Sequence, residues 1–409
     1  MLTRLTIGRF KSLKSVDLTL GALNFFIGAN ASGKSNLFDA IRVLQGIGYG
    51  FTVNEIFNGR PRTTSSAEWD GIRGGSESAL YRPHEKRRGP KKTADKLVHL
   101  STTYQLPSGE YRYSVHFDPA VGVICAESLF INDDKIFDAP IIQSGQPNLT
   151  VSFKRNIGKG APNMAKFERH RPVLHQITAN GYLTEDKRIQ VETFVKVLGD
   201  VEKLDQTPSV LHQYSARQNA ERLGERGEDF AALVGTIGKD KTERQVYVSW
   251  LKELTPRELD DIEILKGAVN DQLFALREGA NVFPAPVLSD GTLRFAALTA
   301  ALFQAVQPSM LLFEEIDNGI HPTRLRLLLE LLRSQTKKLG APQLFATTHS
   351  PILLAWLASA DYKTTFFCRR AQDGASEIHA VSEIPQFHEI LQKTPFSDLF
   401  AEGWLEGAL

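Results

Sequence analysis

The sequence predicts an α/β fold whose two halves are separated along the chain by a long insertion. A short apolar strand at 24–27 runs into a glycine-bearing loop, and apolar residues at helical spacing follow. From residue 290 onward, helical and strand patterns alternate regularly again. At 409 residues, with 42% hydrophobic and 23% charged residues, the chain can bury a sizeable core. We therefore expect both ends of the chain to join in one α/β unit.

Composition and charge exclude several function classes. The formal net charge is +1, so any contact with nucleic acid needs a local basic patch. The two cysteines, Cys125 and Cys368, make neither a disulfide framework nor a metal cluster, and we expect buried, inert thiols in a reducing compartment. The N-terminus lacks a signal peptide, and no window has the length of uncharged apolar sequence that a membrane span needs. These features predict a cytoplasmic protein without a membrane partner.

The first part of the chain, 1–150, is expected to hold strands, the glycine loop and a strand meander. Between about 50 and 96 the sequence is polar and irregular, with a basic run at 82–96. The expected elements are strands at 2–8, 15–20 and 24–27, a loop at 28–35, a helix at 36–45, and strands at 97–106, 110–117 and 121–131.

The rest of the chain divides into an insertion, 151–285, and a second part of the α/β unit, 286–409. The insertion is expected to be mixed and mainly helical between about 185 and 280, without the sustained heptads of a coiled-coil arm. The expected elements after it are helices at 291–306, 322–338 and 351–358, and strands at 309–313, 343–347, 363–369 and 376–381.

The strongest motif is the loop from Gly28 to Ser35, which matches G-x-x-x-x-G-K-S/T in full. Its glycines let backbone N–H groups point at phosphate oxygens, and the next helix presents its positive end to the same anion. Lys34 would reach the β- and γ-phosphates of ATP, and the Ser35 hydroxyl would hold Mg²⁺. The alternative is a chance glycine turn, which the strand before and the helix after disfavour. The predicted nucleotide-binding residues here are Gly28, Asn30, Ala31, Ser32, Gly33, Lys34, Ser35 and Asn36.

The second motif is an apolar strand, Met310 to Phe313, that ends in Glu314 and Glu315. Ligands of open α/β sheets bind at such strand ends. Neighbouring strand residues face opposite ways, so the two acids are expected to have separate roles. By position, Glu314 is predicted to hold the metal and Glu315 to act as general base. The alternative is a solvated acidic strand end.

A third candidate is His349, which follows another apolar strand. Its imidazole could donate a hydrogen bond to the γ-phosphate of ATP and report whether that phosphate is present. A lone histidine is more often a capping or core residue, so this role depends on the neighbouring acids.

A fourth candidate is the segment Leu288 to Arg294 before an alanine-rich helix. Ser289 is a good helix N-cap, and an ordinary capped helix explains every residue here. Function requires the further idea that Ser289 and Gly291, at a free helix N-terminus, make a second phosphate site.

Together, these four elements in this order resemble ABC-type ATPases of the SMC/RecF-like branch. Leu288–Thr292 sits where that family has L-S-G-G-Q, Glu314 and Glu315 where it has the Walker B acids, and His349 where it has the switch histidine. The segment 317–322 resembles its dimer-contacting loop, and 9–13 resembles the turn that opens such heads. The resemblance implies a homodimer, or a higher oligomer, that sandwiches ATP between the loop of one copy and the serine helix of the other.

A closer resemblance is to stand-alone bacterial AAA family ATPases related to the ATPase parts of OLD nucleases and of anti-phage defence systems. The segments that carry it are 71–75, 289–294, 314–322 and 347–351. Such ATPases are often paired with a separately encoded effector, commonly a nuclease. The resemblance covers the two terminal parts of the chain well and the middle only loosely.

The sequence departs from the family pattern in four ways. Glu314 replaces the usual aspartate, and Thr292 replaces glutamine. Asp290 replaces a glycine, which puts a carboxylate where the partner's γ-phosphate is expected; unless that carboxylate turns away or pairs with a cation, its charge opposes closure. The glutamine of the Q-loop has no clear counterpart, since Gln45 lies on the first helix.

Three functional readings follow. The first is a dimeric ATP-driven switch that holds or controls an effector, most plausibly a nuclease encoded nearby in anti-phage defence. The alternative is a RecF-like repair ATPase that clamps duplex DNA through the basic run 82–96, although such runs are often just solvated loops. The third, the ATPase of a membrane transporter, fits poorly because such subunits lack the 9–13 turn and so long an insertion.

Overall fold

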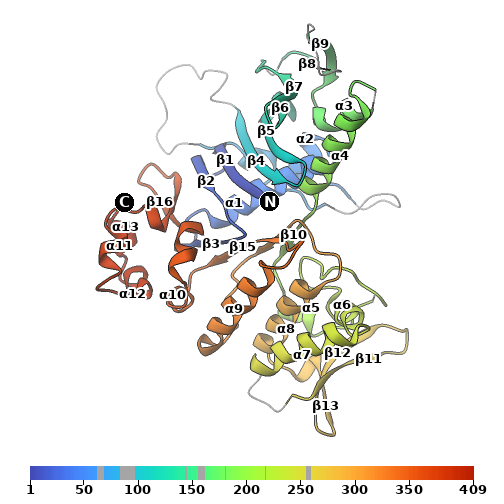
Figure 1. Ribbon diagram of the computed structural model, residues 1–409, viewed down its shortest axis with the longest axis vertical. Coiled ribbons are helices and arrows are strands. Elements are labelled where there is room, and N and C mark those ends of the chain that lie inside the picture. Colours follow the sequence, from blue (N-terminus) through green and yellow to red (C-terminus); the bar gives the residue numbers. More distant parts are fainter. Residues whose placement is uncertain are drawn as a thin grey trace. The chain divides into compact units, whose positions relative to one another are not determined.

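The computed structural model describes residues 1–61, 69–82, 97–142, 145–154, 162–179, 181–216, 218–254 and 259–409. The chain forms two compact units, each assembled from segments that are distant in sequence (Figure 1). The first unit comprises Met1–Gly21, Gly28–Val201 and Phe366–Ala380. The second unit comprises Ala22–Ile27, Glu202–Thr365 and Val381–Leu409.

The first unit is built on a sheet with the strand order β16-β17-β2-β1-β4-β5-β6-β7-β8-β9. Its neighbours pair antiparallel, except that β17 pairs parallel with β2. Buried residues alternate with more exposed ones along β4, as expected for an antiparallel sheet with one covered face. The strands are β1 (Leu2–Phe10), β2 (Leu13–Thr19), β4 (Val98–Leu106), β5 (Gly109–Asp118), β6 (Val123–Ile131), β7 (Asp134–Ala139), β8 (Asn148–Phe153), β9 (Asn163–Glu168), β16 (Thr365–Arg370) and β17 (Ser376–Ala380).

Helices cover the buried face of this sheet. The ring of Phe194 on α4 lies 5.4 Å from that of Tyr104 and 5.3 Å from that of Tyr111, centroid to centroid. Contacts of this kind bury large apolar area and fix α4 on the sheet. The helices of the first unit are α1 (Lys34–Gly48), α2 (Val53–Asn58), η1 (Ser76–Ser78), α3 (Val173–Ala179) and α4 (Glu185–Gly199).

The second unit contains a sheet with the order β10-β14-β15-β3. Strands β14 and β3 both pair parallel with β15, and every residue of these three strands is buried, as expected for a parallel sheet covered on both faces. The strands are β3 (Leu23–Ile27), β10 (Val201–Leu204), β14 (Met310–Phe313) and β15 (Gln343–Thr348). The later helices are α8 (Asp290–Phe303), η4 (Pro322–Arg324), α9 (Leu325–Gln335), α10 (Pro351–Leu354), η5 (Ser359–Thr364), η6 (Val381–Glu383), α11 (Phe387–Ile390), α12 (Phe396–Ala401) and α13 (Trp404–Gly407).

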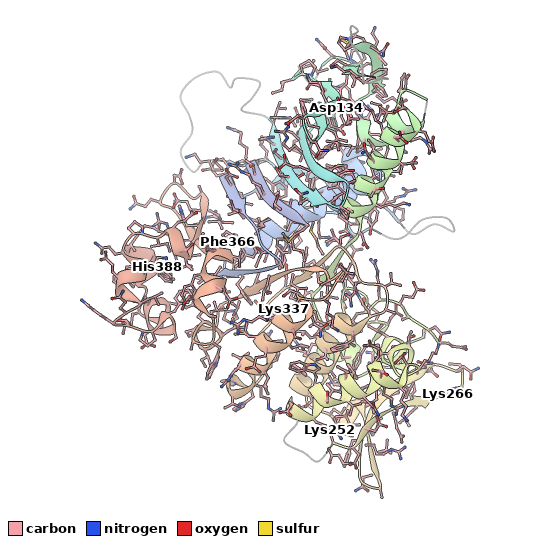
Figure 2. All side chains as sticks on the ribbon, viewed as in Figure 1. Asp134, Lys252, Lys266, Lys337, Phe366 and His388 are labelled. Atoms are coloured by element: carbon pink, nitrogen blue, oxygen red, sulfur yellow. The ribbon has the colours of Figure 1, made fainter. Side chains whose placement is uncertain are left out.

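The second unit also holds a small antiparallel sheet, β11-β12-β13, packed with α6 (Figure 1). The sequence predicts mainly helix here and misses this sheet. The buried run Leu273 to Leu276 in β12 is continuous, and a short apolar run does not distinguish a strand from a buried helix. Lys252 on α7 and Lys266 at the end of β11 are both exposed in this region (Figure 2). The elements are α5 (Pro208–Leu211), α6 (Phe230–Ile237), α7 (Lys241–Leu254), β11 (Asp261–Lys266), β12 (Gln272–Glu278), β13 (Asn281–Pro284) and η3 (Ala285–Val287).

The α/β class and the strand–loop–helix order at the N-terminus are confirmed. The expected three-part division is not the division that the structure shows. The boundary between 150 and 151 falls inside β8, and that between 285 and 286 falls inside η3. The units instead divide near residue 201, with β3 assigned to the second unit and β16 and β17 to the first.

Among the described residues, no helix combines the length and the apolar character that crossing a bilayer requires.

Candidate functional site

The glycine loop begins one residue after β3 ends at Ile27, and α1 begins at Lys34. Gly28 has φ 142°, and a Cβ there would lie 2.2 Å from the carbonyl oxygen of Cys368. Only glycine fits at that distance. Gly33, just before the helix, has φ 108°, a conformation that other residues rarely adopt. The two glycines of the motif are therefore required by the backbone itself.

The Lys34 side chain folds back onto the loop and binds its backbone. Its Nζ donates to the carbonyl oxygens of Gly28 at 2.6 Å and Ala29 at 2.8 Å. Ser32 is buried, and its Oγ finds no hydrogen-bond partner among the described residues. Leaving a buried hydroxyl unpaired costs about 1–3 kcal/mol, which an acceptor oxygen of a phosphate would offset. The loop thus fits an anion of phosphate chemistry.

The start of α1 is tied to the turn between β1 and β2. Asn36 Nδ2 donates to Ser12 Oγ at 2.7 Å, and Ser12 Oγ lies 2.7 Å from Ser376 Oγ. The Asn36 amide therefore anchors the loop, although it was predicted to contact nucleotide. Ser35 is half-buried in the first turn of the helix.

The segments 9–13 and 71–75, which carry part of the sequence resemblance, each contribute a cation to an ion-pair cluster with α1. Lys11 Nζ lies 2.5 Å from Asp39 Oδ2 on α1, and Arg73 Nη2 lies 3.1 Å from the same oxygen. Burial lowers the pKa of Lys11, and the Asp39 charge partly opposes that shift. Asp39 was missed from the sequence; the available signal was a single acid among the buried apolar residues of a helix.

Both cysteines are free and buried, as expected. Burial raises the pKa of Cys368 to about 12, and the nearby Lys34 ammonium lowers it only in part. This thiol stays protonated at neutral pH and is a poor nucleophile.

In the second unit, Glu314 and Glu315 lie in a tight turn directly after β14. The Glu314 N–H donates to Leu204 O at 3.1 Å, and the Glu315 N–H donates to Thr347 Oγ1 at 2.9 Å. Glu315 has φ 47°, a left-handed conformation that is uncommon for a non-glycine residue and often marks functional sites. The turn is thus held by the two strands β10 and β15.

The expectation that the two acids alternate along a strand is wrong, because β14 ends at Phe313. Their separation comes from the turn. Glu314 Oε1 lies 3.7 Å from Lys203 Nζ, whereas Glu315 Oε2 accepts from Asn318 Nδ2 at 3.3 Å. The two carboxylates have different partners, which is compatible with separate roles.

Gln206 lies beside these acids and was not identified from the sequence. It follows β10 by two residues and lines a cavity of about 30 Å³ together with Glu314 and Glu315. The Gln206 amide is oriented so that its nitrogen and its oxygen both have partners. The nitrogen donates to Arg294 O and the oxygen accepts from the Leu298 N–H, each at 3.0 Å. The signal was a glutamine just after a strand, but β10 has only four residues and was itself missed.

Ser289 and Gly291 lie at the N-terminus of α8. Ser289 Oγ accepts from the Thr292 N–H at 3.3 Å, which confirms the predicted N-cap. A Cβ on Gly291 would lie 2.2 Å from Gly319 O, so α8 packs against the loop after β14 at a distance that only glycine allows. Ser289 and Gly291 border a cavity of about 110 Å³.

The Asp290 carboxylate pairs with a histidine. His212 Nε2 lies 2.9 Å from Asp290 Oδ1, and His212 Nδ1 lies 2.8 Å from Ala285 O. The carboxylate that replaces the family's glycine therefore has a hydrogen-bonding partner within its own unit.

His349 is exposed immediately after β15. In the parallel register, Thr348 pairs with Ile27, the last residue of β3, and Ala346 pairs with Phe313, the last residue of β14. The carboxyl ends of these strands, where the predicted acids and His349 follow, therefore lie along one edge of this sheet.

The basic run 82–96 lies outside the described residues except for Arg82, whose Nη2 donates to Glu77 O at 2.8 Å. Of the other predicted residues, Gly28 to Asn36 are brought together in the first unit. Ser289, Gly291, Glu314, Glu315 and His349 belong to the second.

Comparison with known proteins identifies the family. Residues 23–355 match the model of a family described as "AAA domain, putative AbiEii toxin, Type IV TA system". A Helicobacter pylori protein named ATP/GTP phosphatase is 22% identical over 388 residues, which cover 91% of this chain and 93% of that protein.

Two solved structures share the fold. One is an Smc head bound to the C-winged helix domain of ScpA (TM-score 0.52, 14% identity, 92% of this chain and 96% of that chain). The other, derived from Pyrococcus furiosus, is an Smc head with an extended coiled coil bound to the C-terminal domain of ScpA (TM-score 0.50, 14% identity, 96% and 99%). At these identities the likeness concerns the fold alone.

Proposed function

The chain belongs to the AAA-domain family described as putative AbiEii toxin of type IV toxin–antitoxin systems and is an ATPase of the ABC and SMC-like type; on this premise we propose that it is a dimeric switch that closes on ATP to control a separately encoded effector. The observation that carries the proposal is the exposed N-terminus of α8. Ser289 is exposed there, and Gly291 holds the helix against the loop after β14. A helix N-terminus is a ready anion site, and a second copy could use it to cover ATP bound by the glycine loop.

The glycine loop supplies the binding half of the reaction. Backbone N–H groups of Gly28 to Asn36 and the Lys34 ammonium would hold the phosphates of ATP. The buried Ser32 hydroxyl, which has no hydrogen-bond partner among the described residues, would donate to a phosphate oxygen.

Magnesium would be held by oxygen donors, the Ser35 hydroxyl and the Glu314 carboxylate, which are ligands of the kind it prefers. When bound, it neutralises phosphate charge and so favours attack by water on the γ-phosphate.

Glu315 would act as general base. Its carboxylate is exposed, and Glu315 Oε2 accepts a hydrogen bond from Asn318 Nδ2 at 3.3 Å. It can therefore accept a proton from an attacking water. His349, at the end of the neighbouring strand, would contact the γ-phosphate. Gln206 would transmit the presence of that phosphate to α8, because its amide bonds to the backbone of Arg294 and Leu298.

Control of an effector is supported by the family description, which names a putative AbiEii toxin and a type IV toxin–antitoxin system. The Smc heads of similar fold bind a protein partner, ScpA, in their solved structures. A nuclease acting in anti-phage defence is the effector that the sequence resemblance favours.

Affinity capture tests this proposal. The Glu315→Gln protein, expressed with its native flanking genes, should retain ATP and carry a stoichiometric companion protein that mass spectrometry identifies. The Lys34→Ala protein is the matched control and should lose that companion if ATP controls the interaction. Recovery of DNA alone, released by salt, would instead support the RecF-like clamp.

A further inference from the structure

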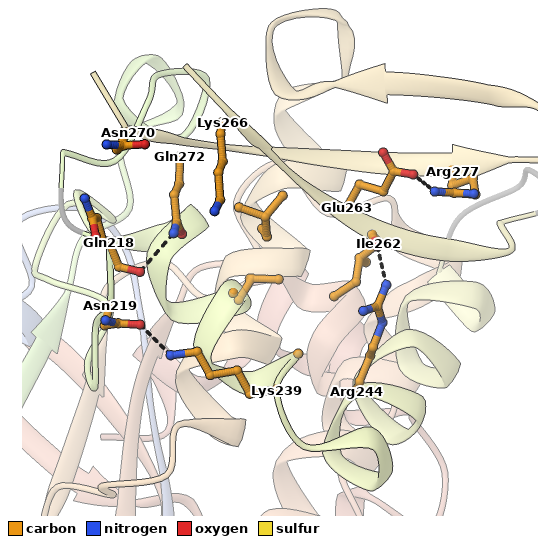
Figure 3. A pocket seen from close by; sticks show the side chains of 14 residues that line it. Gln218, Asn219, Lys239, Arg244, Ile262, Glu263, Lys266, Asn270, Gln272 and Arg277 are labelled. Atoms are coloured by element: carbon orange, nitrogen blue, oxygen red, sulfur yellow. Dashed lines mark hydrogen bonds and ion pairs between the residues drawn. The ribbon is translucent and has the colours of Figure 1, made fainter. Parts of the chain in front are cut away.

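The second unit contains a cavity of about 570 Å³ whose lining residues, between 218 and 277, lie outside the nucleotide motifs (Figure 3). It lies among α6, the start of α7 and the strands β11 and β12, in the small sheet that the sequence analysis missed. Its volume is within the range of cavities that hold drug-sized ligands. None of the residues given a role above lines it.

One wall presents a buried acceptor that lacks a donor. Gln272 is only 9% exposed, and its Nε2 donates to Gln218 O at 2.9 Å. Its Oε1 has no hydrogen-bond partner among the described residues. Leaving a buried acceptor without a donor destabilises the folded protein, so an N–H group of a ligand at this position would be strongly favoured.

Two lysines give the cavity uncompensated positive charge. Figure 3 shows Lys266 and Gln272 projecting into the cavity from β11 and β12. Lys239 Nζ bonds to the neutral amide oxygen of Asn219 at 2.5 Å, and neither lysine has a carboxylate partner within the described part of the chain.

The two arginines of the cavity differ from the lysines, because carboxylates already neutralise them. Arg244 pairs with Asp261, with Nη2 and Oδ2 2.9 Å apart, and Arg277 pairs with Glu263. The excess charge therefore lies with Lys239 and Lys266. Flexible ammonium groups at a cavity rim suit phosphate, which lysine commonly binds.

The remaining surface suits a flat group. Ile262 and Ile264 of β11 supply apolar contacts, and Gly235 on α6 contributes no side chain. A Cβ at Gly235 would lie 3.0 Å from Gln272 Oε1, so the glycine leaves that oxygen accessible. A ligand that combines a planar ring, an N–H donor and a phosphate matches all three parts of the cavity.

We propose that this cavity binds a nucleoside phosphate, with the phosphate held by Lys239 and Lys266 and an N–H group of the base donating to Gln272 Oε1. This is a second site, separate in sequence from the glycine loop. It adjoins α7, whose Tyr247 hydroxyl donates to Ala296 O on α8 at 2.9 Å, so an occupied cavity would stiffen the support of the Ser289 helix.

Titration calorimetry of the full-length Lys34→Ala protein tests the site, since that change removes binding at the glycine loop. The probes are AMP, GMP, adenosine and inorganic phosphate. We expect at least one nucleotide to bind at least about 10-fold more tightly than adenosine or phosphate, because each part contributes a charged or buried hydrogen bond.

Two further substitutions locate the binding. Lys266→Ala, at an exposed rim position, and Gln272→Leu should each weaken nucleotide binding by about 10-fold. Lys252→Ala removes another exposed lysine of the same unit and should leave binding unchanged (Figure 2). If Gln272→Leu disturbs folding, Lys266→Glu tests the same site from the rim, through the phosphate contact.

Hydrogen exchange decides where any residual binding occurs. Protection of the amides of β11 and β12 on adding nucleotide is the expected result. Absence of saturable binding, binding indifferent to Lys266→Ala, or protection confined to residues 28–36 would overturn the proposal. Equal affinity for phosphate and nucleotide would overturn the nucleoside part.

Discussion

The glycine loop and the N-terminus of α8 make an instructive pair, because both place a helix N-terminus where an anion can bind. Each depends on a glycine whose missing Cβ would lie 2.2 Å from a backbone oxygen, Cys368 O for Gly28 and Gly319 O for Gly291. They differ in their charged support. Beside the loop, Lys11 and Asp39 form a pair whose side chains are 9% and 3% exposed. At α8, His212 and Asp290 form a pair whose side chains are 25% and 64% exposed.

The difference suggests that the loop is a finished site and the α8 terminus is half of one. The loop carries its own cation, Lys34, and its supporting ion pair between Lys11 and Asp39 is buried. The α8 terminus carries a carboxylate held aside by a half-exposed histidine. Under the proposed function, a second copy would bring the phosphate charge of its bound ATP to this surface.

The largest expected effect is on the loop. Lys34→Ala should abolish ATP binding and lower ATP turnover by at least about 100-fold, because it removes the charge aimed at the phosphates. Equilibrium binding of a fluorescent ATP analogue and phosphate release measure both quantities. Lys14→Ala, an exposed lysine of the same unit, is the control and should behave as wild type. Retained ATP affinity in Lys34→Ala would contradict the loop assignment.

The next effect separates binding from hydrolysis. Glu315→Gln should lower turnover by about 10²–10⁴-fold and leave ATP affinity intact, since a general base acts only in the chemical step. Glu330→Gln, an exposed acid on α9, should change neither quantity. Normal turnover in Glu315→Gln would mean that the base lies elsewhere.

A stability measurement compares the two ion pairs directly. Asp39→Asn leaves Lys11 buried without its carboxylate and should lower the free energy of unfolding by about 3 kcal/mol. Asp290→Asn should lower it by less than about 1 kcal/mol, because that pair is largely exposed. Urea unfolding of both variants gives the comparison. Equal losses of unfolding free energy in the two variants would show that the Lys11–Asp39 and His212–Asp290 pairs contribute equally to stability, contrary to this comparison.

The smallest expected effect concerns closure. Asp290→Asn should favour ATP-dependent dimers by a few-fold, on the order of 1 kcal/mol, by removing a charge that repels phosphate. His212→Ala should disfavour them by a similar amount, because it frees that charge. Analytical ultracentrifugation with ATP measures both, and the account is wrong here if both variants match wild type.

The loop motif and the regular elements around it could be predicted from sequence because short-range rules govern them. The strand, glycine loop and helix at 23–48 follow from apolar spacing and a phosphate-loop pattern. The same holds for β14 and β15, whose fully buried residues form clear apolar runs.

The missed features depend on contacts between distant residues. Asp39 becomes a partner of Lys11 and Arg73 only when three segments fold together. Gln206 becomes notable only because β10 lies beside β14. The His212–Asp290 pair joins residues 78 apart in sequence. No local pattern encodes these contacts.

The central claim is that ATP joins two copies through the exposed Ser289 end of α8. The most direct measurement is light scattering of the Glu315→Gln protein after size exclusion, with and without ATP and Mg²⁺. One chain has a mass of 45.5 kDa, and the account predicts that ATP doubles it, or raises it to an even multiple. Adding Ser289→Arg to the same protein should restore the single-chain mass. A single-chain mass with ATP, or a dimer indifferent to Ser289→Arg, would contradict the claim.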